Sequence, residues 1–531
     1  MTVEQVIDGT TDSHKIPVWE QLAIERRAVR DHKVAEWQPG PMPTLEPGQT
    51  FVRSVPRYCG LLTADQITIT ESSPSQLLRY LADGTWSAES VIRAFIARAT
   101  IAHHLTNPLT DIFFDRAVDD ATRLDAILRE TGEPVGPLHG LPISLKDVMH
   151  TNGVELVTKL REAGAVFYCK TNIPQTLMSG ECVNYIYGRT STPFNTLLSA
   201  GGSSGGEGSL ISLGGSPLGI GSDIAGSIRT PANFNGIYGL CPSPDRLPGH
   251  SSENSDGSMI IRGVVGPLSR SPWEWDFSSA RIPWREEEYV LGRGQVRWQC
   301  FGFMAHDSIV LPNPPILRGI QEMRSALLRA GQQVIDIEPF DGKELADAAF
   351  HVFLATGGEE VTKLLSILNE PLIKEVPRPD PSTKIPVLEY HECAVMIKQM
   401  RQKYLDIWQA TAARTETGCP IDAIILPSGG TVAPPHGTME YFTYEVISNV
   451  LEWTCATVPV TVVDSLQDPK PTSFEAMSED DQRNWEKYTP EYYKDAPVCL
   501  QVMGRRYEEE KVLGLLRTID QALGRGDCYM A

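Results

Sequence analysis

Glycine and serine make up more than half of residues 200–229, AGGSSGGEGSLISLGGSPLGIGSDIAGSIR. A flexible linker would not need the apolar side chains of this tract, such as Leu210 and Ile220, or the charge of Glu207. Dense glycine in an ordered, apolar segment instead indicates backbone N–H groups held close to a ligand. Serine hydroxyls beside such N–H groups are candidate nucleophiles for acyl transfer.

Phosphate-binding loops and a nucleophile elbow are the alternative interpretations of this tract. It lacks the GK[ST] of a Walker A loop, and its glycines do not form a dinucleotide-binding fingerprint. Residues 201–205, GGSSG, match the G-x-S-x-G elbow, but the residues before them contain a proline and no strand alternation. The later His250 and His436 stand in no persuasive context for a triad, although the elbow stays open as an alternative.

A second chemical signal lies upstream, in GLPISLKD, where an apolar strand over residues 141–145 leads directly into Lys146 and Asp147. GGSSGG, DIAGSIR and GLPISLKD together resemble the amidase-signature family of serine hydrolases. Further matches are AGAVFYCKTNIPQ, GIYGLCPS, GVVGPLSRS, PIDAIILPS and VCLQVMGRRYEEEKVL. WEQLAIERR near the N-terminus and the overall length are similar to the fungal general amidases and acetamidases.

The resemblance implies a catalytic triad of Lys146, Ser203 and Ser227, with Ser203 in a cis peptide and Ser227 as the nucleophile. The lysine can accept a proton only when it is neutral, so its pKa must fall from about 10.4 through burial. The apolar residues before Lys146 favour that burial. Lys146 would then take a proton from Ser203, which takes one from Ser227, and Ser227 becomes acylated.

The resemblance also implies an oxyanion hole and a substrate-facing loop. The expected oxyanion donors are the backbone N–H groups of four consecutive residues, Ile224, Ala225, Gly226 and Ser227. Ala225 replaces a glycine of many relatives, which matters if that position needs a positive φ. Candidate pocket walls are Leu177 and Met178, and the residues expected to support the loops are Ser204, Asp223 and Arg229.

Two segments are short against the family pattern. Only VMHTNGV separates Asp147 from Glu155, where relatives carry a long Ser/Thr-rich loop, and PWEWDFSSARIPWR follows GPLSRS where a helix is expected. A missing wall beside Lys146 would admit water and return its pKa toward about 10.

The resemblance of the motifs predicts an amidase that hydrolyses a small carboxylic acid amide through an acyl-serine. The alternative is a catalytically impaired homologue that binds amides or a protein, and a weaker one is a transamidase subunit that passes ammonia to a partner.

The expected elements alternate helices with short apolar strands, which indicates an α/β fold. Helices are expected over residues 18–37, 115–129, 155–163, 316–330 and 507–523, with another after an N-cap at Ser87; strands are expected over 141–145, 165–169, 333–337, 423–426 and 457–463. The predicted fold class is α/β: one large amidase-signature domain with a twisted mixed sheet covered by helices on both faces. Residues 1–75 are expected to form a helical arm on a catalytic domain of residues 76–531, whose glycine–serine core covers about 136–270.

Composition limits the other classes of protein. Among 531 residues, 67 Asp and Glu exceed 47 Lys and Arg, so a net charge of −20 disfavours nucleic acid as a partner. The ten cysteines form no CxxC pair and the histidines form no HExxH motif, so neither a metal nor a cofactor is expected. No signal peptide or transmembrane segment is evident, which predicts a cytoplasmic protein with a small amide as its substrate. A homodimer is an open alternative to a monomer.

Overall fold

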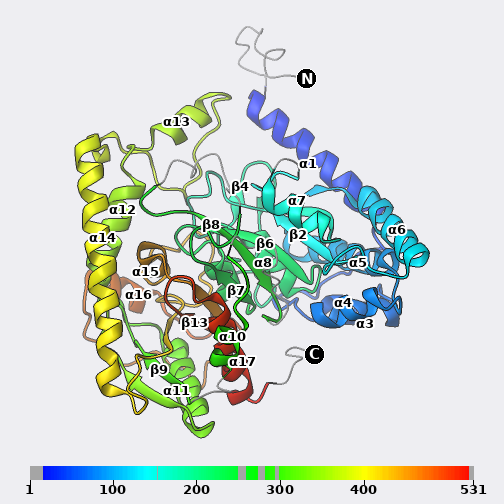
Figure 1. The fold of residues 1–531 in the computed structure, drawn as a ribbon. Coiled ribbons are helices and arrows are strands. Elements are labelled where there is room, and N and C mark those ends of the chain that lie inside the picture. The colour runs from blue at the N-terminus through cyan, green and yellow to red at the C-terminus, as the bar shows by residue number, and fades with distance from the viewer. Residues whose placement is uncertain (1–15, 152–153, 249–258, 273–281, 294–297, 526–531) are drawn as a thin grey trace.

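A mixed sheet of eleven strands runs through the centre of the protein (Figure 1). The computed structural model describes residues 16–151, 154–248, 259–272, 282–293 and 298–525. The strands, in their order across the sheet, are β1 (Leu109–Ile112), β3 (Val166–Thr171), β2 (Pro142–Lys146), β6 (Leu218–Asp223), β8 (Val264–Ser269), β7 (Tyr238–Cys241), β12 (Cys455–Val462), β13 (Pro497–Met503), β11 (Ala423–Pro427), β9 (Cys300–Phe303) and β10 (Gln333–Asp336). A separate hairpin pairs β4 (Val183–Asn184) with β5 (Gly188–Arg189).

The sheet is mixed because it contains both parallel and antiparallel pairs of strands. Strand β2 is parallel to both β3 and β6, whereas β6 is antiparallel to β8. The parallel register sets Ser144 beside Gly219, so the carboxyl ends of β2 and β6 lie at the same edge. Lys146 and Asp223 are the last residues of these two strands. The topology therefore brings the lysine of SLKD next to the strand that leads into DIAGSIR.

Helices flank the sheet, and Figure 1 shows those of the first half of the chain gathered opposite the long helix α14. The first group is α1 (Val18–Glu36), α2 (Val55–Tyr58), α3 (Ala64–Glu71), α4 (Pro74–Ala82), α5 (Ala88–Thr106), α6 (Phe114–Thr131), α7 (Glu155–Glu162), α8 (Gly205–Ser212) and α9 (Arg229–Phe234). The second is α10 (Glu286–Gly292), α11 (Pro314–Arg329), α12 (Gly342–Phe353), α13 (Glu359–Ser366), α14 (Val387–Ala410), α15 (Thr443–Leu451), α16 (Glu479–Lys487) and α17 (Glu509–Ala522). The predicted α/β class with a mixed sheet is confirmed.

Local signals in the sequence explain several helix ends. The Ser87 hydroxyl accepts a hydrogen bond from the N–H of Ser90, so the predicted N-cap of α5 is present. Gly132 and Gly164 have φ values of 75° and 98°, and each follows the helix that it was expected to end. The helices expected over residues 18–37, 115–129, 155–163, 316–330 and 507–523 correspond to α1, α6, α7, α11 and α17, with ends shifted by a few residues.

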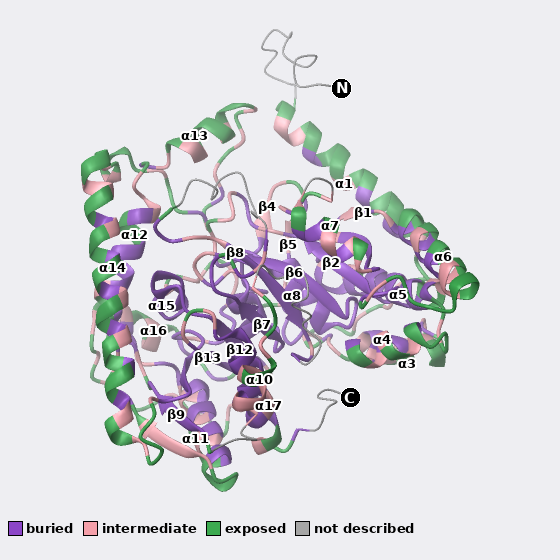
Figure 2. Ribbon diagram, viewed as in Figure 1, coloured by how far each residue is buried: buried purple, intermediate pink, exposed green. Residues whose placement is uncertain are grey.

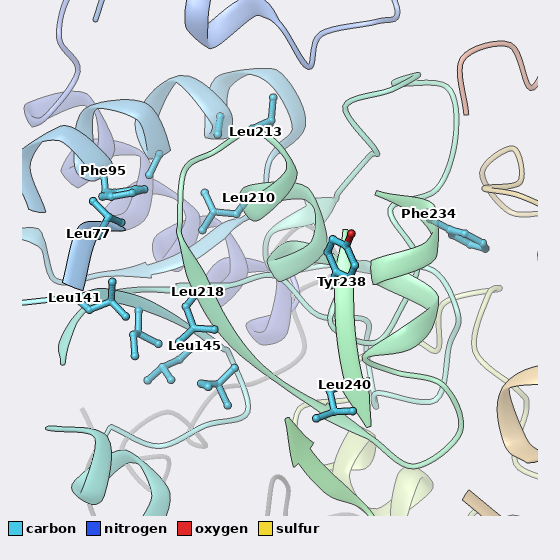
Figure 3. Packing of buried hydrophobic residues seen from close by; sticks show 14 of the residues in the cluster. Leu77, Phe95, Leu141, Leu145, Leu210, Leu213, Leu218, Phe234, Tyr238 and Leu240 are labelled. Carbon is cyan, nitrogen blue, oxygen red and sulfur yellow. The ribbon is translucent and has the colours of Figure 1, made fainter. Parts of the chain in front are cut away.

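Most strands of the sheet are buried, although the edge strand β10 is only partly so, while the outer helices expose their far faces (Figure 2). Apolar side chains from β2, β6 and α8 meet in one cluster, which includes Leu145, Leu218 and Leu210 (Figure 3). Alternate residues of a strand point to opposite faces, so Leu145 points away from the face that carries Ser144 and Lys146. The apolar core on one side of β2 thus fixes the strand whose other face carries the lysine.

Candidate active site

Lys146 ends strand β2 and is completely buried, with 0% of its surface exposed. Its Nζ lies 2.6 Å from Oγ of Ser203 and 2.7 Å from Oγ of Ser222. Burial lowers the pKa of Lys146 from 10.5 to about 7, against the opposing influence of the acidic groups nearby. The amine therefore has a substantial neutral fraction near pH 7, as a proton acceptor requires.

Ser203 stands immediately before α8, and the peptide bond between Gly202 and Ser203 is cis. A Cβ at Gly202 would overlap the carbonyl oxygen of Ser179, so only glycine fits between the two loops. Next to it, the N–H of Ser204 donates to the carbonyl of Ser227 at 3.1 Å. This backbone bond joins the loop of Ser203 to the loop of Ser227.

The loop that carries Ser227 runs from β6 to α9. Among the described residues, the N–H groups of Ile224, Ala225 and Ser227 meet no hydrogen-bond acceptor, and neither does the half-buried Ser227 hydroxyl. The N–H of Gly226, which was expected among the oxyanion donors, instead donates to Oδ1 of Asp223 at 2.8 Å. Gly226 has a φ of +97°, whereas Ala225 has no positive φ, so alanine is compatible with that position.

Asp223 and Arg229 brace this loop from within the protein. Asp223 accepts hydrogen bonds from the N–H groups of Gly226 and Ile228 and pairs with the Arg229 guanidinium at 3.0 Å. Burial alone would raise the pKa of Asp223, but Arg229 and the two N–H donors lower it to about 2. Both ends of the loop are thereby tied to one carboxylate that stays ionised at any working pH.

The side chains of two distant elements complete the brace. Arg229 also donates to Oε1 of Gln501 on β13 at 2.7 Å and to Oδ1 of Asn449 on α15 at 2.6 Å. Neither residue was predicted, because no motif in the sequence joins them to the glycine–serine tract. Their contacts with Arg229 become visible only in the structure, because they depend on the antiparallel pairing of β13 with β12 and on the packing of α15.

Ser222 and Glu207 are further polar residues near Lys146 that the sequence did not single out. Ser222 is buried and shares the amine of Lys146 with Ser203. Glu207 on α8 accepts hydrogen bonds from the hydroxyls of Ser144 and Thr171 at 2.6 and 2.8 Å, and burial raises its pKa to about 7. For Glu207, the signal in the sequence was its place in GGSSGGE, where it is the one charged residue among small residues.

Leu177 and Met178, the predicted pocket walls, lie in a loop that packs against the Gly202–Ser203 peptide through residues 179–181. Leu177 is half-buried with a φ of 64°, and Met178 is 39% exposed.

The side chains of Arg189 and Gln175 fasten this loop to a later segment. Arg189 bridges Glu181 and Glu375 at 2.7 and 2.5 Å. Gln175 accepts a hydrogen bond from the N–H of Ile373 at 2.9 Å.

The short segment after Lys146 does not open the site to solvent. Met149 donates its N–H to the carbonyl of Lys146, and both residues are buried. The expected loss of a wall around the lysine is therefore not seen. The other short segment, PWEWDFSSARIPWR, falls largely on residues 273–281, outside the described residues.

Groups of three or more His, Cys, Asp or Glu side chains that could hold a metal ion do not occur within the described ranges. Within the same ranges, no helix has the length and apolar character to cross a bilayer. Both observations concern only the part of the chain that the structure describes.

Comparison with known proteins identifies the class of enzyme. A family model described as Amidase matches residues 90–513. Acetamidases of Aspergillus oryzae and Emericella nidulans are each 37% identical to the chain, over 95% of its length and 99% and 98% of theirs. The protein is therefore an amide hydrolase that acts on carbon–nitrogen bonds. It belongs to the amidase-signature family.

Solved structures agree with this assignment. A structure titled fatty acid amide hydrolase superimposes with a TM-score of 0.82 at 28% identity, covering 100% of both chains. A bacterial aryl acylamidase of the amidase-signature family has a TM-score of 0.65 at 18% identity, covering 86% of this chain and 97% of its own. At that identity the second comparison concerns the fold alone.

Proposed function

We propose that the protein hydrolyses a small carboxylic acid amide to the acid and ammonia, or to the acid and an amine, with Ser227 as the acylated residue. The observation that carries this proposal is the buried Lys146 amine, 2.6 Å from the Ser203 hydroxyl. A lysine that is hydrogen-bonded to a serine and has a pKa of about 7 has the properties of a general base.

In the first half of the reaction, neutral Lys146 takes the proton of Ser203 while Ser203 takes that of Ser227. The Ser227 hydroxyl has no hydrogen bond to a described residue, so it is free to turn toward Ser203. Its Oγ attacks the amide carbon, and the carbonyl oxygen gains the negative charge. The unpaired N–H groups of Ile224, Ala225 and Ser227 are suited to stabilise that charge, each contributing about 3 kcal/mol in hydrolases where a donor has been removed.

In the second half, the protonated lysine returns its proton through Ser203 to the leaving nitrogen, and the C–N bond breaks. Water then attacks the ester of Ser227 and gives up a proton to the same pair, which releases the acid. The sum is one amide and one water converted to one acid and one amine. Lys146, Ser203 and Ser227 end in their starting states.

The burial of Lys146 favours an active enzyme over the impaired homologue. An impaired site would be expected to admit water to the lysine, yet the shortened segment leaves the amine enclosed. Two acetamidases are 37% identical to the chain over 95% of its length, which supports a small acyl group in the substrate.

The nucleophile can be tested with a fluorophosphonate probe, followed by mapping of the modified serine. We expect labelling of Ser227 in the parent, loss of labelling in Ser227→Ala and slow residual labelling in Ser203→Ala. Labelling that persists in Ser227→Ala and disappears in Ser203→Ala would instead support a nucleophile elbow. A parent that is never labelled and hydrolyses no amide would support a binding protein.

A further inference from the structure

Glu445 is a buried carboxyl group that the proposed reaction does not use. It lies in the first turn of α15 and is 1% exposed. A Cβ built on Gly226 would lie 2.5 Å from the Cβ of Glu445 and 2.8 Å from its Cγ. The side chain of Glu445 therefore packs directly against the loop of residues 224–227, the proposed oxyanion loop. Its Oε1 lies 3.3 Å from the position of a Cβ on Gly429, which follows strand β11.

No cation among the described residues pairs with this carboxyl group. Within the described part of the chain, Oε2 of Glu445 has no hydrogen-bond partner and the side chain enters no ion pair. Arg229 is the cation nearby, but its hydrogen bonds go to Asp223, Gln501 and Asn449. A buried carboxylate without a partner is costly, and the group avoids that cost by keeping its proton.

The charged groups around Glu445 agree with a protonated form. Burial is the dominant cause that raises the pKa of Glu445, from 4.5 to about 8. A hydrogen bond from its own backbone and Arg229 on α9 lower the pKa, whereas Asp307, which accepts a hydrogen bond from Tyr441, and Asp223 at the end of β6 raise it.

We propose that Glu445 is a positioning residue of the amide-hydrolysing site, which supports the oxyanion loop as a neutral acid and disables it when it ionises. This inference rests on the proposed function, because it assumes that the loop of residues 224–227 stabilises the oxyanion. A negative charge packed against Gly226 would oppose the charge that develops on the substrate oxygen. It would also repel Asp223, which holds the loop in place.

The predicted consequence is an upper pH limit that belongs to Glu445. Its folded pKa is raised, so the productive neutral form is present below about pH 8 and is lost as the pH rises further. We expect kcat/KM to fall about tenfold for each pH unit above that value. The lower limit belongs to Lys146, which must lose its proton.

The test compares pH profiles of kcat/KM for the parent, Glu445→Gln and Glu440→Gln. Glutamine keeps the size of the side chain and cannot ionise, so Glu445→Gln should lose the alkaline fall and keep the acidic limb. Glu440 is five residues earlier, is exposed and pairs with Lys487, so Glu440→Gln should behave as the parent. Glu445→Asp retains an acid and should recover an alkaline limb, which a purely structural role would not predict.

Several outcomes would overturn the inference. A parent profile that stays flat on the alkaline side, or a fall that persists in a folded Glu445→Gln variant, would each do so. If Glu445→Gln does not fold, Glu445→Met serves as the neutral variant. Infrared difference spectroscopy of the parent against the neutral variant then provides a readout without activity: the parent should have an additional C=O band of a protonated acid at neutral pH, which disappears on titration above about pH 8. An inactive parent that shows this band would count against the proposed function alone.

Discussion

Lys146 combines a titratable side chain with surroundings that exclude water. Its amine is enclosed and hydrogen-bonded to Ser203 and Ser222. Burial lowers the pKa of Lys146 from 10.5 to about 7. The proposed base is therefore available near neutral pH, and the short segment after Lys146 does not return its pKa toward about 10. At the scale of one residue, burial is what makes a lysine useful as a base.

We expect kcat/KM to rise with pH through the pKa of Lys146, about 7, and to reach its maximum before the alkaline fall that the ionisation of Glu445 predicts. The lowered pKa sets the sign, because the active form is the deprotonated one and it accumulates as the pH rises. Lys146→Met should lower kcat/KM about 10²- to 10⁴-fold and should remove the acidic limb of the pH profile. Lys159, a partly exposed lysine on α7, provides the control in Lys159→Met. Equal rates in parent and Lys146→Met at every pH would exclude lysine as the base.

Single residues were predictable where a motif carried them. Lys146, Ser203 and Ser227 stand in short motifs whose spacing is visible in the sequence, and the structure brings the first two into contact. Ser222 was not predictable, since its contact with Lys146 depends on the parallel register of β2 and β6. Glu445 was even harder to predict, because it lies 218 positions after Ser227 in the sequence and no local pattern marks it.

The loop of residues 224–227 is the element on which the proposed reaction depends, and its shape is set by two constraints. Asp223 ties down the N–H groups of Gly226 and Ile228, and Gly226 adopts a φ of +97°. The donors that remain are those of residues on either side of Gly226. The loop is thus held by its own backbone, while α15 closes the space behind it.

Gly226→Ala should therefore damage activity much more than stability. The new Cβ would add the strain of a positive φ, about 1 kcal/mol, and would meet Glu445 at 2.5 Å. Because the loop must shift, we expect kcat/KM to fall about 10²-fold. Gly84→Ala is the control, since Gly84 has a φ of +72° and no atom within 4 Å of the added Cβ. Similar kinetics for the two variants would show that Gly226 is not close to the reaction.

Elements with a clear period could be predicted, and elements made of glycine could not. The helical spacing of apolar residues indicated α5 and α11, but α8 has the sequence GGEGSLIS and low intrinsic helix propensity. Its glycines permit close packing: a Cβ at Gly206 would overlap Asn172, and one at Gly219 on β6 would overlap Glu207. Much of the glycine that suggested a ligand-binding loop therefore serves the contact between α8 and the sheet.

The whole molecule is organised around a sheet to which both halves of the chain contribute. Strands β1 to β8 form one end and β9 to β13 the other, apart from the separate β4–β5 hairpin, and β7 pairs with β12 where the halves meet. The brace of Asp223, Arg229, Gln501 and Asn449 crosses the same junction. The composition predicted a globular protein and the motifs an enzyme, but the strand order follows from long-range pairing that no local sequence pattern encodes.

Helix α1 attaches the predicted N-terminal arm to this sheet at its β1 edge. Arg30 is buried, and its Nη1 donates to Oδ1 of Asn107 and to the carbonyl of Leu109, both at 3.1 Å. Lys33 donates to the carbonyl of Ile112, the last residue of β1. Through these bonds the arm satisfies acceptors along an edge strand that would otherwise be exposed.

We expect Arg30→Ala to lower the free energy of unfolding by about 1–3 kcal/mol, because it leaves buried acceptors without donors. Arg26→Ala is the control, since Arg26 is an exposed arginine of the same helix. Urea unfolding followed by fluorescence and by loss of amidase activity should give one coincident transition, shifted only in Arg30→Ala. A separate early transition, with activity kept until a later one, would mean that residues 1–75 unfold independently of the catalytic domain. A single transition would mean that the arm and the sheet that positions Lys146 unfold together.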